Sequence, residues 1–434
     1  MKNFRRVIAL LAAAVMLLCA LTACSKKETN NDKTDTPSET GKVTIRFMVN
    51  GSAEELAIYE KAVNAFNAQS EKTEVKLIGV TGDDYTAQVM TQLSTKEAPD
   101  CFYAEEGSYG ELNKSGNLAD LSAYLNGADS VLKKSDIPEN ILEAYSFGDT
   151  VTGVPVDCNP EVLYFNQTLL ESLGVKSPLE YVAEGTWNYA NFQKVCEELV
   201  AAGKIGFVWE NWWGPVQTFL LSQGDSLYTA DGQANIDTDR VRAGMNYLND
   251  NMTAGNFLYA GKLESGESAD TLFKAGDTGF VYAGRWSVPG FEDVSFTYDV
   301  VQFPYYEEPS QAICSMPATP MVMNAATANP DNVWEFISFY CGAEGQRLRM
   351  DGQGNAVPTV PGLEDIVLTG KPANSQAFLD AVDIAFLYPQ QETLHPGLTD
   401  ALTGEVETML VGDQDADTTV ANMQAAAQEM LSAE

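Results

Sequence analysis

The segment from residue 43 to residue 103 alternates between two hydrophobic periods, and this alternation limits the possible folds most strongly. Residues 43–49 carry an apolar side chain at every second position, which predicts a β-strand. Residues 56–66 then carry apolar side chains at helical spacing, and residues 75–80 return to a strand pattern. A further helical segment leads to a strand that begins near residue 99. Strand–helix–strand order predicts a parallel sheet with right-handed crossovers, and therefore an α/β fold.

Polar residues follow two of these predicted strands. Asn50 closes the first strand, and Glu105 and Glu106 follow the strand that begins near residue 99. In an open α/β sheet, ligands bind in the loops at the carboxyl ends of the strands. These three residues are therefore candidate ligand-binding residues.

The N-terminal segment has the pattern of an export signal. Residues 1–23 combine basic residues with a short apolar run, which predicts a signal peptide. Residues 21–24 (LTAC) resemble a bacterial lipobox, which implies lipidation of Cys24; a plain signal peptide with an accidental cysteine is the alternative. Residues 24–41 are otherwise polar and are expected to form a disordered tether behind the lipid. The protein is thus expected outside the cytoplasm, anchored to the cell membrane, with a Gram-positive surface favoured over a Gram-negative one.

Charge and histidine content exclude several classes of protein. The chain has 434 residues, of which 61 are acidic and 26 basic, and its formal net charge is −35. This acidity argues against nucleic acid as a partner and against a membrane contact other than the lipid. His395 is the single histidine and therefore the only residue that could serve in Ser-His or Cys-His catalysis. It is expected at the surface or packed between the lobes. No GxSxG motif and no glycine-rich phosphate loop occurs, so no catalytic residue and no cofactor is predicted.

No metal site is predicted either. Asp413, Asp415 and Asp417 have the spacing of a calcium loop. Such a loop also needs a glycine and a terminal glutamate, where this chain has Thr418 and Gln424, so a helix N-terminus is the favoured interpretation. The five cysteines after the N-terminal segment cannot all pair and lack CxxC spacing, so buried thiols are favoured over disulfides. They are Cys101, Cys158, Cys196, Cys314 and Cys341.

Several segments resemble, in order, the extracellular solute-binding proteins of carbohydrate ABC transporters (family 1, maltose-binding-like). An opening strand and helix are followed by PDCFY, by GVPVD with a YFN run, and by a Thr–Trp helix entry. FKAG, a GF pair, a tryptophan and a late helix followed by EGQ complete the series. The matching residues are 43–66, 99–103, 112–121, 153–157, 164–166, 169–175, 186–187, 273–276, 279–280, 286, 329–340 and 344–346.

This resemblance implies a two-lobed periplasmic-binding-protein fold (class II-like) with the ligand cleft between the lobes. One lobe is expected to contain residues 43–150 and 279–325, and the other residues 155–270 and 330–434. Such a protein is a monomer without catalytic activity. It captures a sugar or oligosaccharide as the lobes close about a hinge, and delivers it to an ABC permease and its ATPase. Two alternatives remain: the same fold binding a peptide or polyamine, or a secreted glycoside hydrolase with two catalytic carboxylates.

Tryptophans are the first candidates for sugar contacts, because a sugar offers C–H faces to aromatic rings and hydroxyls to polar groups. Trp209, Trp212 and Trp213 lie in an irregular segment and are expected to supply at least one stacking ring. Trp286 directly follows a predicted strand at residues 279–283, where the resemblance places a ligand aromatic. Helical patterns predict that the remaining tryptophans, Trp187 and Trp334, are core residues.

Polar candidates lie near the expected hinge and beside Trp286. Asp157 and Asn159 occupy a loop after a predicted strand, and Asp157 is expected to accept hydrogen bonds from two ligand hydroxyls. Arg285 is expected to donate to a ligand hydroxyl or carboxylate, with a salt bridge as the alternative. Ala104 stands where well-known maltose-binding proteins carry an aromatic residue, so their ligand geometry is not carried over to this chain.

Overall fold

Five strands of the described residues form the first sheet, in the order β2-β1-β3-β13-β6. The period-2 segment forms β1 (Val43–Asn50), which pairs in parallel with β2 (Thr73–Val80) and with β3 (Cys101–Tyr103). The prediction of parallel strands in this region is therefore confirmed. β13 (Pro320–Met323) pairs antiparallel with β3 and with β6 (Val154–Pro155). The sheet is thus mixed, and its last two strands come from distant parts of the chain.

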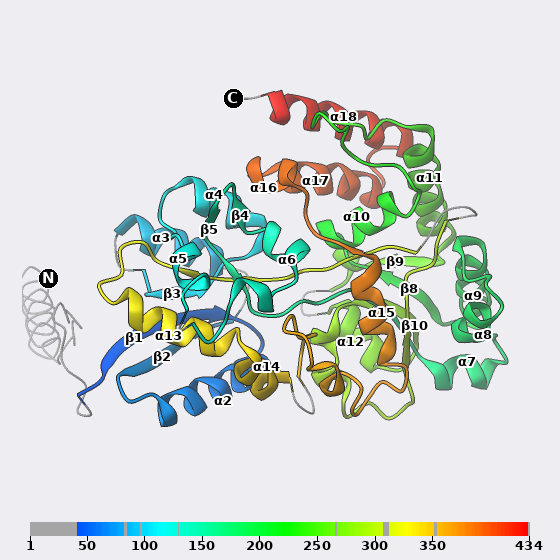
Figure 1. The fold of residues 1–434 in the computed structure, drawn as a ribbon. Coiled ribbons are helices and arrows are strands. Elements are labelled where there is room, and N and C mark those ends of the chain that lie inside the picture. The colour runs from blue at the N-terminus through cyan, green and yellow to red at the C-terminus, as the bar shows by residue number, and fades with distance from the viewer. Residues whose placement is uncertain are drawn as a thin grey trace, which may run out of the picture. The chain divides into compact units, whose positions relative to one another are not determined.

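Helices cover this sheet and connect its strands. α2 (Ala53–Gln69) packs on β2, and α13 (Pro330–Tyr340) packs on α2, β1, β2 and β13 (Figure 1). α14 (Ala343–Met350) packs on α2 and α13. α3 (Tyr85–Thr95) connects β2 with β3, and α4 (Glu106–Lys114) follows β3.

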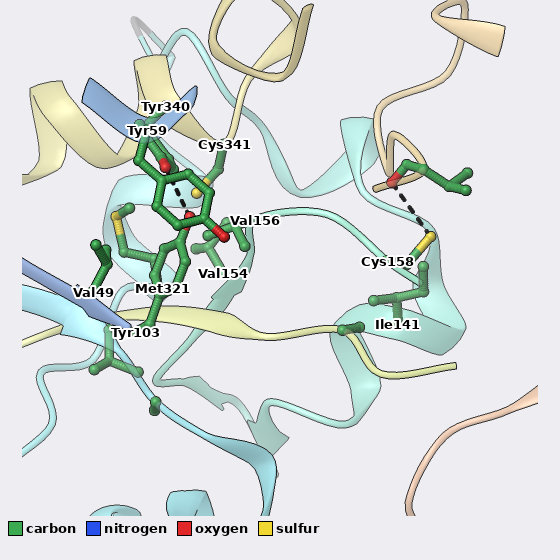
Figure 2. Close-up of a cluster of buried hydrophobic side chains, with 14 of the residues drawn as sticks. Val49, Tyr59, Tyr103, Ile141, Val154, Val156, Cys158, Met321, Tyr340 and Cys341 are labelled. Atoms are coloured by element: carbon green, nitrogen blue, oxygen red, sulfur yellow. Dashed lines mark hydrogen bonds between the residues drawn. The ribbon is translucent and has the colours of Figure 1, made fainter. Parts of the chain in front are cut away.

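Aromatic rings fill the space between β1 and α13. Phe47 lies edge-to-face against Tyr103, Phe336 and Tyr340, with ring centroids 5.5, 5.1 and 5.2 Å apart. The hydroxyl groups of Tyr103 and Tyr340 hydrogen-bond to each other at 2.8 Å (Figure 2). Edge-to-face pairs of this kind add to the stabilisation from burial, and here they hold α13 against the strands.

The second sheet has the strand order β11-β7-β10-β8-β9. β7 (Val162–Phe165) pairs antiparallel with β10 (Thr278–Ala283) and with β11 (Asp299–Val301). β10 pairs in parallel with β8 (Ile205–Trp209), which pairs in parallel with β9 (Phe257–Tyr259). The expected strand at residues 279–283 is confirmed as β10.

Both faces of the second sheet are buried. Tyr164 and Val281 contribute to one hydrophobic cluster, and their chain neighbours Phe165 and Phe280 contribute to the other, as the alternation of a strand requires. On the first face lie α12 (Ala269–Lys274) and α15 (Gln376–Ile384); on the second lie α9 (Tyr189–Ala201), α10 (Trp213–Leu221) and α11 (Asp239–Ala254).

The structure, a computed structural model, describes residues 41–81, 85–95, 98–128, 130–264, 267–306, 312–350 and 354–432. The expected signal peptide (1–23), Cys24 and the tether up to residue 40 lie outside these residues. The segment from Lys42 to Glu434 forms one compact unit. Across the described ranges, no helix is both long and apolar enough to cross a membrane.

Short elements complete the fold. The remaining helices of the described residues are α5 (Ser122–Leu125), α6 (Glu139–Glu143), α7 (Gln167–Leu173), α8 (Pro178–Ala183), α16 (Gln390–Leu394), α17 (Leu398–Val411) and α18 (Ala416–Ser432). The 3-10 helices of the described residues are η1 (Lys134–Asp136), η2 (Ala260–Lys262), η3 (Arg285–Ser287), η4 (Pro289–Phe291) and η5 (Glu364–Ile366). Two-stranded pairs join β4 (Ser146–Phe147) with β5 (Thr150–Val151), and β12 (Cys314–Ser315) with β14 (Ala385–Phe386).

Several expectations about single residues are confirmed. The five cysteines are buried free thiols. Trp187 and Trp334 are core residues. The acidic run near the C-terminus is a helix N-terminus, where the Asp415 carboxylate accepts the Thr418 N–H at 2.7 Å.

Three chain segments pass between the sheets side by side. Residues 156–161 lead from β6 to β7, residues 316–319 lead back to β13, and residues 354–359 follow α14. The backbone hydrogen bonds between them are Val156 N–H to Thr319 (3.0 Å), Asn159 N–H to Pro317 (2.7 Å), Cys158 N–H to Val357 (3.0 Å) and Val357 N–H to Cys158 (2.8 Å). The Cys158 side chain lies at this crossing (Figure 2). The chain therefore passes between the sheets more than once.

The strand pairing differs from the expected division of the chain into lobes. Residues 279–325 were expected with the first sheet, but β10 and β11 belong to the second sheet, and β13 returns to the first. Residues 330–434 were expected with the second sheet, but α13 and α14 pack on the first. Hydrophobic periodicity identifies buried strands and helices, whereas the sheet that each one joins depends on contacts with residues far away in the sequence.

Candidate functional site

Two indole rings meet at the carboxyl ends of neighbouring parallel strands. Trp212 follows β8 and Trp286 follows β10, and these two strands pair in parallel. The ring centroids lie 6.4 Å apart with an interplanar angle of 59°. Both side chains are partly exposed, so each can contact a ligand as well as its partner ring. The structure thus brings together two of the four tryptophans that the sequence analysis selected.

Glycines beside the two rings permit this arrangement. A Cβ atom on Gly284 would lie 2.2 Å from the Trp286 ring, and one on Gly214 would lie 2.4 Å from the Trp212 ring. The same position on Gly214 lies 2.8 Å from Oε2 of Glu161. The indoles therefore fold back over backbone that carries no side chain, and a buried carboxylate lies beside Trp212.

Two further carboxyl groups lie near the ends of these strands. Glu210 follows β8 and accepts the Ala269 N–H at 3.3 Å, and Asp270 accepts the Ser287 hydroxyl at 3.0 Å. Burial raises the pKa of Glu210, and the nearby charge of Asp270 raises it further. Burial also raises the pKa of Asp270. Carboxyl groups that have lost hydration in this way are suited to accept hydrogen bonds from ligand hydroxyls.

A pocket of about 960 Å³ connects Trp286 with elements of the first sheet. Its wall is rich in charge, and it combines residues at the start of α2 with residues on α12 and α14. Lining residues include Glu54, Glu55, Lys61, Asp270, Lys274, Trp286 and Arg349. A pocket of about 980 Å³ beside α5 and α6 contains no aromatic side chain in its lining. The pocket at Trp286 is the better ligand site, because it combines a stacking ring with acceptors and donors from both sheets.

The candidates on the first sheet also meet one another. Asn50 and Glu105 stand at the carboxyl ends of β1 and β3, and the Asn50 amide donates to Oε1 of Glu105 at 2.8 Å. The Thr86 hydroxyl donates to the other carboxylate oxygen. Glu106 is the first residue of α4. Asn50 and Glu105, which were selected because they follow strands, therefore lie in contact in the structure.

Asp157 forms a buried ion pair. The Arg349 guanidinium on α14 donates to the Asp157 carboxylate at 2.6 Å and also to the Val156 carbonyl, and it stacks over the Tyr340 ring at 4.4 Å. Burial raises the pKa of Asp157, and the adjacent Arg349 charge opposes this shift. Asp157 was expected to accept ligand hydroxyls, but its carboxylate holds α14 to a crossing segment between the sheets.

Three other candidates are buried, in contrast to the expectation of direct contact, whereas a fourth, Asn159, keeps partial exposure. Trp209 is 1% exposed and packs in the core of the second sheet. Trp213 is buried, and its indole N–H donates to Glu392 at 2.7 Å. Arg285 is fully buried and donates to the Ala356 carbonyl at 2.7 Å instead of forming a surface salt bridge. Asn159 is half-buried in a crossing segment.

Sequence reasoning missed several residues of this region. Arg349, Glu161 and Glu392 are buried ionisable residues whose partners lie far away in the sequence. Glu54 and Glu55 had a usable signal, because they begin the helix that follows Asn50 at a strand end. In the described part of the chain, no cluster of three or more His, Cys, Asp or Glu side chains is arranged to hold a metal ion.

This architecture defines a class of protein. Two α/β lobes, connected by several crossing segments and sharing a pocket, form the fold of two-lobed solute-binding proteins. Residues 50–347 match the family described as bacterial extracellular solute-binding protein, and the chain belongs to this family. The resemblance stated from the sequence is therefore confirmed.

Individual relatives extend this comparison. The chain is 30% identical over 200 residues to an uncharacterised lipoprotein of Streptomyces antibioticus, a match that spans 46% of this chain and 41% of that protein. It is 24% identical over 406 residues to the multiple sugar-binding protein of Streptococcus mutans, which covers 88% of this chain and 89% of the relative. Among solved structures, an ABC substrate-binding protein of Listeria monocytogenes in complex with cycloalternan superposes with a TM-score of 0.79 at 18% identity, over 89% of this chain and 98% of that one. This structural similarity confirms the two-lobed fold.

Proposed function

We propose that this protein captures a sugar or oligosaccharide between its two lobes and delivers it to an ABC permease and its ATPase. The observation that carries the proposal is the Trp212–Trp286 pair at the ends of parallel strands, with Trp286 lining a pocket rich in carboxylates. Aromatic faces and paired acceptors are the groups that sugar rings require. The Streptococcus mutans relative is named as a sugar-binding protein, and the Listeria structure contains a saccharide, which supports the same ligand class.

The proposed roles divide the candidate residues into two groups. Trp212 and Trp286 stack on the ligand. The polar groups that bind its hydroxyls are Asn50, Glu105, Glu106 and Asn159, together with Glu54 and Glu55 of the pocket wall. Trp209, Trp213, Arg285 and Asp157 support these residues from buried positions.

The location is part of the proposal. Residues 1–23 direct export, and lipid on Cys24 anchors the protein outside the cytoplasm through a polar tether. The Streptomyces antibioticus relative is described as a lipoprotein, which supports this anchoring. The protein acts as a monomeric binding protein without turnover.

The test of the ligand class is a panel titration of the purified mature domain. The panel contains linear and cyclic glucose oligosaccharides, a monosaccharide set, a polyamine and a short peptide. We expect a sugar to raise the melting temperature, since a ligand that binds only the folded state stabilises it, and to change tryptophan fluorescence. Stabilisation by the polyamine or peptide alone would contradict the sugar assignment. Release of smaller saccharides during incubation would contradict a binding protein without turnover.

A further inference from the structure

α16 lies between the two lobes and contacts both. It packs on α4, which follows β3 of the first sheet, and it contacts α10, which packs among the helices of the second sheet. The contact of α16 with α10 and its contact with α4 involve different groups. This difference indicates which of the two contacts can open.

The contact with α10 depends on a buried carboxyl group. Glu392 accepts hydrogen bonds from Trp213 at 2.7 Å, from Gln217 at 3.1 Å and from Tyr228 at 2.9 Å. All four side chains are buried. Separation of this contact would take four polar groups away from their partners at once, which is costly for buried groups.

The contact with α4 is a close approach of backbones. A Cβ atom on Gly110 would lie 1.6 Å from the Thr393 carbonyl oxygen, so the two helices can approach this closely only because residue 110 is a glycine. The exposed Lys114 at the end of α4 donates to the Leu394 carbonyl. Lys114 is exposed and Thr393 and Leu394 are half-buried, so water can reach these groups when the two helices separate.

We propose that α16 is a closure latch: it stays on α10, and its contact with α4 at Gly110 forms when the lobes close. The latch rests on the proposed function of ligand capture, and it adds a contribution to affinity from residues that do not touch the ligand. When the lobes close, the backbone of α16 at Thr393 thereby contacts the backbone of α4 at Gly110.

The test compares Gly110→Ala with Gly404→Ala. Gly404 lies within α17, and a Cβ atom there would meet nothing within 4 Å, so it is a matched glycine-to-alanine control. We expect Gly110→Ala to keep the melting temperature of the ligand-free protein within about 2 °C and to weaken binding of the best panel ligand at least tenfold. Lys114→Gln should weaken it by a smaller factor, and Gly404→Ala should bind as the wild type does.

A ligand-free measurement separates failure of the latch from failure of the sugar assignment. Spin labels at Glu111→Cys on α4 and Asp400→Cys on α17 report the distance between these two helices, since the five cysteines of the described residues are buried. We expect a short-distance population that Gly110→Ala removes and Gly404→Ala preserves, whichever ligand the protein binds. An unchanged distance distribution in Gly110→Ala, or a variant that fails to fold while Gly404→Ala folds, would overturn the latch, because the contact would then be irrelevant to closure or permanent.

Discussion

At the scale of single residues, buried ionisable groups determine much of the behaviour of this protein. Glu392 is 6% exposed and has three neutral donors around it, from Trp213, Gln217 and Tyr228, instead of a cation. Neutral donors compensate only part of the hydration that a carboxylate loses on burial. Burial therefore raises the pKa of Glu392 to about 8, although the three hydrogen bonds oppose the shift.

This shift predicts a pH-dependent stability. The folded protein holds a proton on Glu392 at pH values where the unfolded chain has lost it, so the free energy of unfolding falls as the pH rises from about 4.5 to about 8. The contribution of this group is at most about 1.4 kcal/mol per pH unit. Glu392→Gln, which mimics the protonated acid, should remove that part of the slope in urea unfolding measured between pH 5 and pH 8.

The matched control for this prediction is Glu429→Gln, which changes an exposed carboxylate on α18. Its pH slope should equal that of the wild type. If Glu392→Gln also retained the wild-type slope, Glu392 would titrate alike in the folded and unfolded states, and the account of its burial would be wrong.

At the scale of elements, an ion pair helps to attach α14 to the crossing segments, beside the hydrogen bonds of Gln346 to Thr359. Arg349 reaches Asp157 at 2.6 Å in the protein interior, and removal of one partner leaves the other charge buried without compensation. Such a loss typically costs about 3–5 kcal/mol. We expect Asp157→Asn to lower the free energy of unfolding by an amount of this order, as measured by urea denaturation.

The same helix supplies the control for this pair. Arg347 on α14 pairs with Asp365 at 3.2 Å at the protein surface, where solvent screens the interaction. Asp365→Asn should therefore leave the urea midpoint near that of the wild type. A double variant Asp157→Asn/Arg349→Met should be less destabilised than the sum of its single variants, and strict additivity would show that the two side chains do not interact.

Element identity was predictable from the sequence where the pattern is local. The alternation in residues 43–49 and the apolar spacing in residues 56–66 depend only on neighbouring residues, and both segments form as expected. Trp209 shows the limit of such reasoning, because its burial results from packing against Phe207 and Phe219 in the core of the second sheet. Asp157 shows the same limit, since its partner Arg349 is 192 residues away. The sequence can predict a polar or aromatic candidate, while its partners depend on the three-dimensional fold.

At the scale of the whole molecule, the two sheets and their crossings divide the protein into parts that a ligand can draw together. The pocket at Trp286 takes residues from both parts, so a ligand in it contacts both at once. Binding energy can shift a two-state equilibrium only when the ligand prefers one state, and contacts to both lobes provide that preference. The formal charge of −35 also disfavours contact between the protein and anionic surfaces.

The anchor is tested by Cys24→Ala in cells that process lipoproteins. The variant lacks the thiol that receives the lipid, so we expect it to move from the membrane fraction to the aqueous phase in a detergent partition assay. The wild type should partition with detergent. Equal partitioning of the two proteins would contradict lipid attachment at Cys24.

The central claim, that a sugar stacks on the Trp212–Trp286 pair, is tested most directly by calorimetric titration of Trp286→Ala with the best saccharide of the panel. We expect affinity to fall at least tenfold, which corresponds to about 1.4 kcal/mol, because the ring supplies both apolar contact and a stacking face. Trp286→Phe should retain part of the affinity, and Trp334→Phe, a change in the core of the first lobe, should retain all of it. Full affinity in Trp286→Ala would contradict the account.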